Sequence, residues 1–156
     1  MSLYTMQNPV FVAYAIAASI MILKIMGQGW VTVYRMMKAK SGFASAEDLL
    51  TGPINRMPHP GQLELNDYVD RSRRIHRNDL ENIPAFLVAG VLLVAVNPPY
   101  EVAVALFGTF VITRLIHTIV YATAQRHEVR AVIYSIGSLI VIFMAIYVLI
   151  ASAYYT

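Results

Sequence analysis

The chain has 156 residues, of which 58% are hydrophobic and only 13% are charged. So apolar a composition, with its charges gathered in a few places, excludes an ordinary soluble domain. The net charge is +3, but the basic residues lie beside apolar segments, where they indicate membrane topology or a binding site and not a nucleic-acid partner. The chain has no cysteine, which excludes disulfides, thiolate metal sites and a cysteine nucleophile supplied by the protein.

Four apolar segments are long enough to cross a membrane, which takes about 20 residues of helix. We expect these membrane-crossing helices over residues 10–35, 73–97, 102–124 and 130–153. The connection over residues 36–72 is rich in Gly, Pro, Asn and acidic residues and is the one long loop. The four spans and their loops use nearly the full length, so the sequence predicts one domain over residues 1–156: an all-α, integral membrane four-helix bundle.

The second span departs from a plain apolar composition. Its uninterrupted apolar run covers only residues 83–96, so the rest of the helix must include the polar residues that precede this run. Charged groups at membrane depth are costly unless they face protein or water, and we therefore expect them to line an interior site. Pro84 leaves the carbonyl of Leu80 without its usual helical partner, which predicts a kink beside this polar segment.

The distribution of Lys and Arg predicts the topology. Nearly all of them lie in or beside the loop between the first and second spans and the loop between the third and fourth. By the positive-inside rule, both loops are cytoplasmic and both chain termini lie on the outer or lumenal side. The membrane would be the endoplasmic reticulum in a eukaryote or the inner membrane in a bacterium.

Polar side chains form one stripe on each of the last three predicted helices, toward the cytoplasmic ends. They are Arg74, Arg77, Asn78 and Glu81 on the second helix, Arg114, His117 and Tyr121 on the third, and Arg130 and Tyr134 on the fourth. At 100° per residue each group falls on one helix face, and the similar depth of the groups suggests that they converge. The excess of guanidinium groups predicts an anionic ligand with carboxylates or phosphates, and Glu81 could hold a ligand ammonium.

Structural explanations exist for individual polar residues. Arginines and carboxylates near helix ends often pair with one another or extend to lipid head groups, and we interpret Lys24 as such a residue. His59 and His127 are interpreted as ordinary loop residues. Carboxylates and imidazoles do not recur at metal-ligand spacing, so no metal is expected. Because a bundle does not need so many clustered polar groups to be stable, the complete set favours a binding site.

The run RSRRIHRNDLENIPAF at residues 71–86 resembles the signature of the MAPEG family, the membrane-associated proteins of eicosanoid and glutathione metabolism. The resemblance continues in FASAED at residues 43–48, in TRLIHTIVY at residues 113–121 and in Arg130-Ala131. Within the family the chain is most similar to the microsomal glutathione transferases and next to the microsomal prostaglandin E synthases. The resemblance implies a homotrimer of four-helix subunits that holds glutathione between neighbouring subunits near the cytoplasmic face.

The resemblance also implies roles for individual residues. Carried onto matching positions, the glutathione contacts are Arg35, Arg73, Arg74, His76, Arg77, Asn78, Glu81, His117 and Tyr121. Arg130 would stabilise the sulfur as a thiolate, with Tyr121 or Tyr134 donating a hydrogen bond to the sulfur or the leaving group. The match of Arg35 requires two extra residues before Phe43. Ala131 stands where the prostaglandin synthases carry serine, which favours a transferase.

The expected activity is conjugation of glutathione to apolar electrophiles that enter from the bilayer, with reduction of lipid hydroperoxides as a further activity. Membrane lipids are expected around the protein. Two alternatives are a glutathione-dependent isomerase similar to prostaglandin E synthase and a non-catalytic, lipid-binding membrane scaffold. A channel is disfavoured because the polar groups occupy a single depth and do not continue along a pore.

Overall fold

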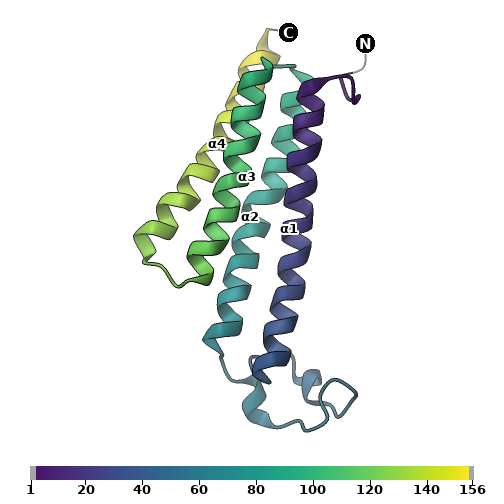
Figure 1. Ribbon diagram of the computed structural model, residues 1–156, viewed down its shortest axis with the longest axis vertical. Helices are drawn as coiled ribbons and strands as arrows, with labels where there is room; N and C mark the ends of the chain where they lie inside the picture. The colour runs from purple at the N-terminus through teal and green to yellow at the C-terminus, as the bar shows by residue number, and fades with distance from the viewer. Residues whose placement is uncertain (1–2, 155–156) are drawn as a thin grey trace.

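Four long helices make up most of the structure, a computed structural model that describes residues 3–154 (Figure 1). They are α1 (Pro9–Ala39), α2 (Asp67–Ala95), α3 (Tyr100–Ala122) and α4 (His127–Ala153). Two short 3-10 helices, η1 (Ala46–Leu49) and η2 (Pro60–Leu63), lie in the loop between α1 and α2, and the described part of the chain contains no strand. Each of the four long helices is long and apolar enough to cross a membrane, which confirms the predicted all-α architecture.

The helices form an antiparallel bundle in which α1 packs on α2 and α3, and α4 packs on α3 and α2. The N-terminal and C-terminal ends of the chain lie together at one end of the bundle, and the two basic loops lie toward the other (Figure 1). The 31 residues of α1 span about 46 Å at 1.5 Å per residue, well beyond the roughly 30 Å of bilayer hydrocarbon. The loop end of α1 and α2 therefore projects beyond the short connection between α3 and α4 (Figure 1).

Asparagine caps set the starts of the first two helices. The side chain of Asn8 accepts a hydrogen bond from the backbone N–H of Val10 at 3.0 Å, and Pro9 follows the cap as the first helical residue. The side chain of Asn66 accepts from the backbone N–H groups of Tyr68 and Val69. Helix α2 therefore begins at Asp67, six residues before the predicted span, because the Asn66 cap lies inside the segment interpreted as loop. Pro84 lies inside α2, which is helical throughout its length.

The core near the terminal end of the bundle is aromatic and apolar. Phe86 of α2 stacks on Phe110 of α3, with ring centroids 4.0 Å apart and planes 3° from parallel. The hydroxyl of Tyr14 donates to the carbonyl of Leu87 at 2.9 Å, and its ring packs on the backbone at Gly90, where any side chain would collide with it. These contacts fix α1, α2 and α3 against one another.

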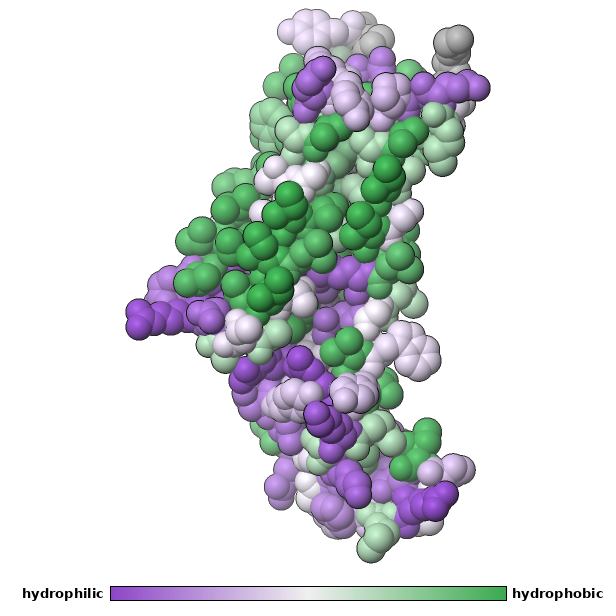
Figure 2. Space-filling model, viewed as in Figure 1, coloured by the Kyte–Doolittle hydropathy of each residue, from purple (hydrophilic) through white to green (hydrophobic). Residues whose placement is uncertain are grey.

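The half of the bundle toward the loop end is polar. On its surface, Figure 2 shows hydrophilic side chains from about mid-height of the molecule down to the loop, and its interior also contains polar contacts. Lys24 of α1 and Asp79 of α2 form an ion pair at 2.5 Å, with side chains only 8% and 0% exposed. One turn further down α1, Gln28 donates to the hydroxyl of Ser72 at 2.7 Å. Helices α1 and α2 are thus joined by polar contacts at the depth of the candidate site.

Candidate functional site

A cavity of about 200 Å³ opens where α2, α3 and α4 meet toward the loop end of the bundle. Its lining residues are Asn78 from α2, His117 and Tyr121 from α3, and His127, Arg130, Ala131 and Tyr134 from α4. Five of these, Asn78, His117, Tyr121, Arg130 and Tyr134, belong to the stripes and the residue set predicted from the sequence. We call this space the polar cavity.

Arg130 supplies the cation of the polar cavity. Its guanidinium carbon lies 4.6 Å from the centre of the Tyr121 ring, a distance at which a cation and an aromatic face attract. Its Nε is buried without a hydrogen-bond partner, and no carboxylate within residues 3–154 forms an ion pair with it. Such a group has unused capacity to bind an anion.

His117 connects the aromatic side chains that surround the polar cavity. Its ring centroid lies 5.0 Å from that of Tyr121 and 6.2 Å from that of Tyr134. The side chain is almost completely buried, and its Nδ1 has no hydrogen-bond partner among the described residues. The cavity therefore combines two phenols, an imidazole and an unpaired guanidinium, which suits a ligand with a polar or anionic reacting atom.

Arg114 does not line the polar cavity, although the sequence placed it on the same stripe as His117 and Tyr121. It is completely buried between α3 and α4, where its Nη2 donates to the carbonyls of Ile133 and Tyr134 at 3.3 and 3.2 Å. Its guanidinium carbon lies 5.5 Å from the centre of the Tyr134 ring. Arg114 therefore holds the turn of α4 that carries Tyr134, one of the residues that line the polar cavity.

The sequence did not identify the contact that makes room for Arg114. A Cβ added at Gly137 would lie 2.5 Å from the Arg114 Nη2, so a side chain cannot be accommodated there while the guanidinium stays in place. Sequence reasoning also missed the contribution of His127, interpreted as a loop residue. His127 is the first residue of α4, and its position three residues before Arg130, on the same helix face, was the available signal.

The basic residues at the loop end of α1 and α2 form a separate group. Arg35 donates a hydrogen bond to the carbonyl of Tyr68 at 3.1 Å. Arg73 forms an ion pair with Asp70 at 2.9 Å and also donates to the carbonyl of Gly42. Arg74 pairs with Asp67 at 2.8 Å. None of these arginines lines the polar cavity.

The remaining predicted residues lie on α2 but outside the polar cavity. His76 faces α1, where it lines a separate cavity of about 390 Å³ with Gly29, Trp30 and neighbouring apolar residues. Arg77 and Glu81 are exposed, and neither forms an ion pair or a side-chain hydrogen bond with any residue from 3 to 154. A single chain therefore brings together only part of the predicted set of site residues. It leaves Arg77 and Glu81 exposed on α2, the helix that also carries Asn78.

These features define a multi-pass integral membrane protein with a cationic, aromatic cavity among its helices. The model of the MAPEG family matches residues 13–150, and the chain belongs to this family, as its residues 71–86 predicted. Microsomal glutathione S-transferase 1 of Bos taurus is 35% identical over 140 residues, which cover 90% of this chain and 89% of the relative, and the protein of that name in Homo sapiens gives the same values. Prostaglandin E synthase of Macaca fascicularis is 29% identical over 144 residues, covering 92% of this chain and 91% of the relative.

Proposed function

We propose that this protein is a membrane-bound glutathione transferase, with the polar cavity holding the sulfur of glutathione. The observation that carries this proposal is the unpaired guanidinium of Arg130 against the ring of Tyr121, in a cavity that Tyr134 also lines. The names of the relatives support a glutathione-dependent activity. The protein has no cysteine, so the thiol of the reaction must come from a co-substrate.

The remainder of glutathione requires more cations than the polar cavity offers. Glutathione carries two carboxylates and one ammonium. The basic residues suited to the carboxylates lie on α1 and α2, outside the polar cavity: Arg35, Arg73, Arg74 and Arg77. His76 and Asn78 would contact the peptide backbone, and Glu81 would accept the ammonium. Arginine is suited to this task because its planar fork matches a carboxylate.

A second copy of the chain would bring the two groups of residues together. Arg77 and Glu81 are exposed on the part of α2 that also carries Asn78 of the polar cavity. Charged groups on a membrane-crossing helix face protein or water and not lipid, so this part of α2 is suited to contact another subunit. We propose a homotrimer in which one subunit supplies the polar cavity and its neighbour supplies basic residues from α1 and α2, on the cytoplasmic side of the membrane.

The proposed reaction begins with glutathione bound as its thiolate. Arg130 stabilises the negative sulfur, which lowers the thiol pKa from about 8.5 in free thiols. The thiolate attacks an electrophilic carbon of an apolar substrate that enters from the bilayer, and the new carbon–sulfur bond replaces the bond to the leaving group, which departs with its electron pair. Tyr121 or Tyr134 donates a hydrogen bond to the sulfur or the leaving group and thereby stabilises the charge that develops there.

Isomerisation of the prostaglandin E synthase type is a second candidate, because three relatives carry the name prostaglandin E synthase. Ala131 follows Arg130 and lines the polar cavity, so no hydroxyl group is available at this position to contact a substrate oxygen. This feature favours conjugation over isomerisation. Reduction of lipid hydroperoxides would use the same thiolate.

The test is a titration of the purified, detergent-solubilised protein with glutathione, followed by the ultraviolet absorbance of the thiolate. We expect saturable thiolate formation at a pH below the pKa of free glutathione, and conjugation when a chlorinated nitrobenzene is added. Saturable binding without turnover of any electrophile or hydroperoxide would favour the non-catalytic scaffold. Absence of saturable binding by the folded protein would contradict the proposed function.

A further inference from the structure

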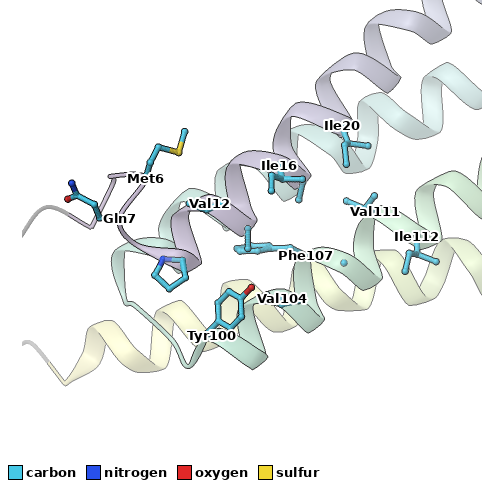
Figure 3. A pocket seen from close by; sticks show the side chains of 14 residues that line it. Met6, Gln7, Val12, Ile16, Ile20, Tyr100, Val104, Phe107, Val111 and Ile112 are labelled. Carbon is cyan, nitrogen blue, oxygen red and sulfur yellow. The ribbon is translucent and has the colours of Figure 1, made fainter.

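A second cavity lies far from the polar cavity, between the first halves of α1 and α3 (Figure 3). We call it the terminal groove, because it lies at the end of the bundle that carries the chain termini. Its volume is about 540 Å³, within the range of small-molecule sites. None of its 14 lining residues is charged, and Phe107 lies between its two walls.

Small side chains create the terminal groove. Ala13 and Ala17 line it from α1, and Gly108 lines it from α3. A Cβ added at Gly108 would meet no other atom within 4 Å, so this glycine borders open space and is not required by a close helix contact. The small side chains therefore leave a groove between the two helices, with Phe107 between its walls, that an apolar guest can enter.

The terminal groove lies at the opposite end of the bundle from the α1 and α2 residues that we assign to contacts between subunits. All of its lining residues belong to α1, α3 or the segment before α1, and none belongs to α2 or α4. The exposed Arg77 and Glu81, by contrast, lie on α2. The groove therefore opens toward the bilayer if α2 faces a second copy, a step that rests on the proposed assembly.

The dimensions of the groove match one leaflet of the membrane. Its α1 wall runs from Pro9 to Ile20, about 16 Å at 1.5 Å per residue, and half of the bilayer hydrocarbon is about 15 Å. Its polar side chains, Gln7 and Tyr100, lie at the terminal end, where the membrane surface would be. The Tyr100 hydroxyl points into the groove (Figure 3) and has no hydrogen-bond partner in the described chain.

We propose that the terminal groove binds one acyl chain of a phospholipid from the leaflet on the side of the chain termini. The acyl chain would lie between α1 and α3 over Ala13, Ala17 and Gly108. The Tyr100 hydroxyl would donate to an ester carbonyl of the same lipid, consistent with the preference of tyrosine for the membrane interface. The bound chain would fill the space between the two helices at the end of the bundle opposite the polar cavity.

The test is photo-crosslinking in vesicles of phosphatidylcholine that contain a phosphatidylcholine with a diazirine in the middle of one acyl chain. After irradiation, the labelled positions are mapped by peptide mass spectrometry. We expect residues 9–20 and 100–112 to carry several-fold more label than the exposed apolar residues of α4, such as Leu139 and Leu149. This measurement requires no glutathione, so its result is independent of the proposed enzymatic activity.

Two leucine substitutions at glycines provide a matched pair. Gly108→Leu fills the groove and should remove the excess label, whereas Gly27→Leu should preserve it, because Gly27 also borders open space but does not line the groove. Ala13→Leu, on the opposite wall, should repeat the effect of Gly108→Leu. Helical circular dichroism and the elution volume establish that each variant is folded.

Two outcomes would overturn the proposal. The first outcome is equal labelling of the groove and α4, or labelling of the groove in Gly108→Leu and Ala13→Leu that is the same as in the wild type. Either result would mean that the groove holds only exchanging bulk lipid. Label on the groove below that on α4 would mean that protein covers the groove, and that α1 and α3 contact a second copy.

Discussion

The guanidinium of Arg130 on α4 lies against the ring of Tyr121 on α3, with 4.6 Å between the guanidinium carbon and the ring centre. This contact positions the cation without neutralising it, because an aromatic face attracts a cation but carries no net charge. A carboxylate partner would have competed with an anionic ligand for the same guanidinium. The arrangement therefore fixes the position of Arg130 and leaves its charge available for the proposed thiolate.

The first prediction concerns this cation. Arg130→Leu should lower kcat for conjugation by about 10²-fold or more, the typical effect of removing one charge-stabilising group from an active site. The KM for glutathione should change much less, because the proposed contacts of the glutathione carboxylates are other residues. Steady-state kinetics with a chlorinated nitrobenzene separate the two parameters. Arg126→Leu is the matched control: Arg126 is exposed one turn earlier, and its loss should leave kcat unchanged.

The second prediction concerns binding of the glutathione carboxylates. Arg74→Ala should raise the KM for glutathione by about tenfold or more, since a hydrogen bond to a charged group contributes about 1.5–3 kcal/mol and 1.4 kcal/mol corresponds to tenfold. The kcat should be nearly unchanged. Arg71→Ala is the control, because Arg71 and Arg74 both pair with Asp67 and only Arg74 is a proposed ligand contact. Equal effects of the two substitutions would contradict the role of Arg74.

Much of the architecture could be predicted because membrane helices have strong sequence signals. Length and composition located all four helices, and the spacing of polar residues identified five residues of the polar cavity. The start of α2 was harder to predict. The Asn66 cap is followed by a charged first turn of helix, and a search for apolar segments leaves such a turn outside the predicted span. The signal for a helix start is a single capping residue, whereas the signal for a membrane-crossing helix is the average hydropathy of about 20 residues.

The interior contacts of the site could not be predicted from helix faces alone. Lys24 and Asp79 are each a single polar residue on a different helix, and only the packing of α1 on α2 shows that they pair. Arg114 shares a face with His117 in the sequence, yet it turns toward the backbone of α4 because Gly137 leaves space there. Packing also separates the basic residues: Arg130 lines the polar cavity, whereas Arg35, Arg73 and Arg74 lie at the loop end of α1 and α2.

The third prediction tests the buried ion pair. Asp79→Leu should leave the Lys24 ammonium buried without a partner and destabilise the protein by about 3–5 kcal/mol. The double variant Lys24→Met with Asp79→Leu should recover most of this loss, because it removes both charges and retains similar side-chain volume. Thermal unfolding in detergent, followed by circular dichroism, provides the comparison. A double variant no more stable than Asp79→Leu would show that the pair is not the source of the effect.

The last prediction concerns the space that Gly137 leaves for Arg114. Gly137→Ala should destabilise the protein by about 1–3 kcal/mol, the usual cost of overpacking, because the added Cβ would lie 2.5 Å from a guanidinium nitrogen that also binds the carbonyls of Ile133 and Tyr134. The displaced turn carries Tyr134, so kcat should fall as well. Gly27→Ala is the control: its Cβ meets no atom within 4 Å, and replacing a helical glycine by alanine stabilises a helix by about 0.5–1 kcal/mol.

A double variant distinguishes this collision from a general intolerance of alanine at residue 137. If the Arg114 guanidinium is the obstacle, Arg114→Met should remove most of the penalty of Gly137→Ala, and the two changes should be non-additive by about 0.5–3 kcal/mol. Additive effects on the thermal unfolding midpoint would mean that another neighbour restricts residue 137. Recovery of stability without recovery of kcat is expected, because Arg114→Met also removes the hydrogen bonds that hold the α4 turn beside the polar cavity.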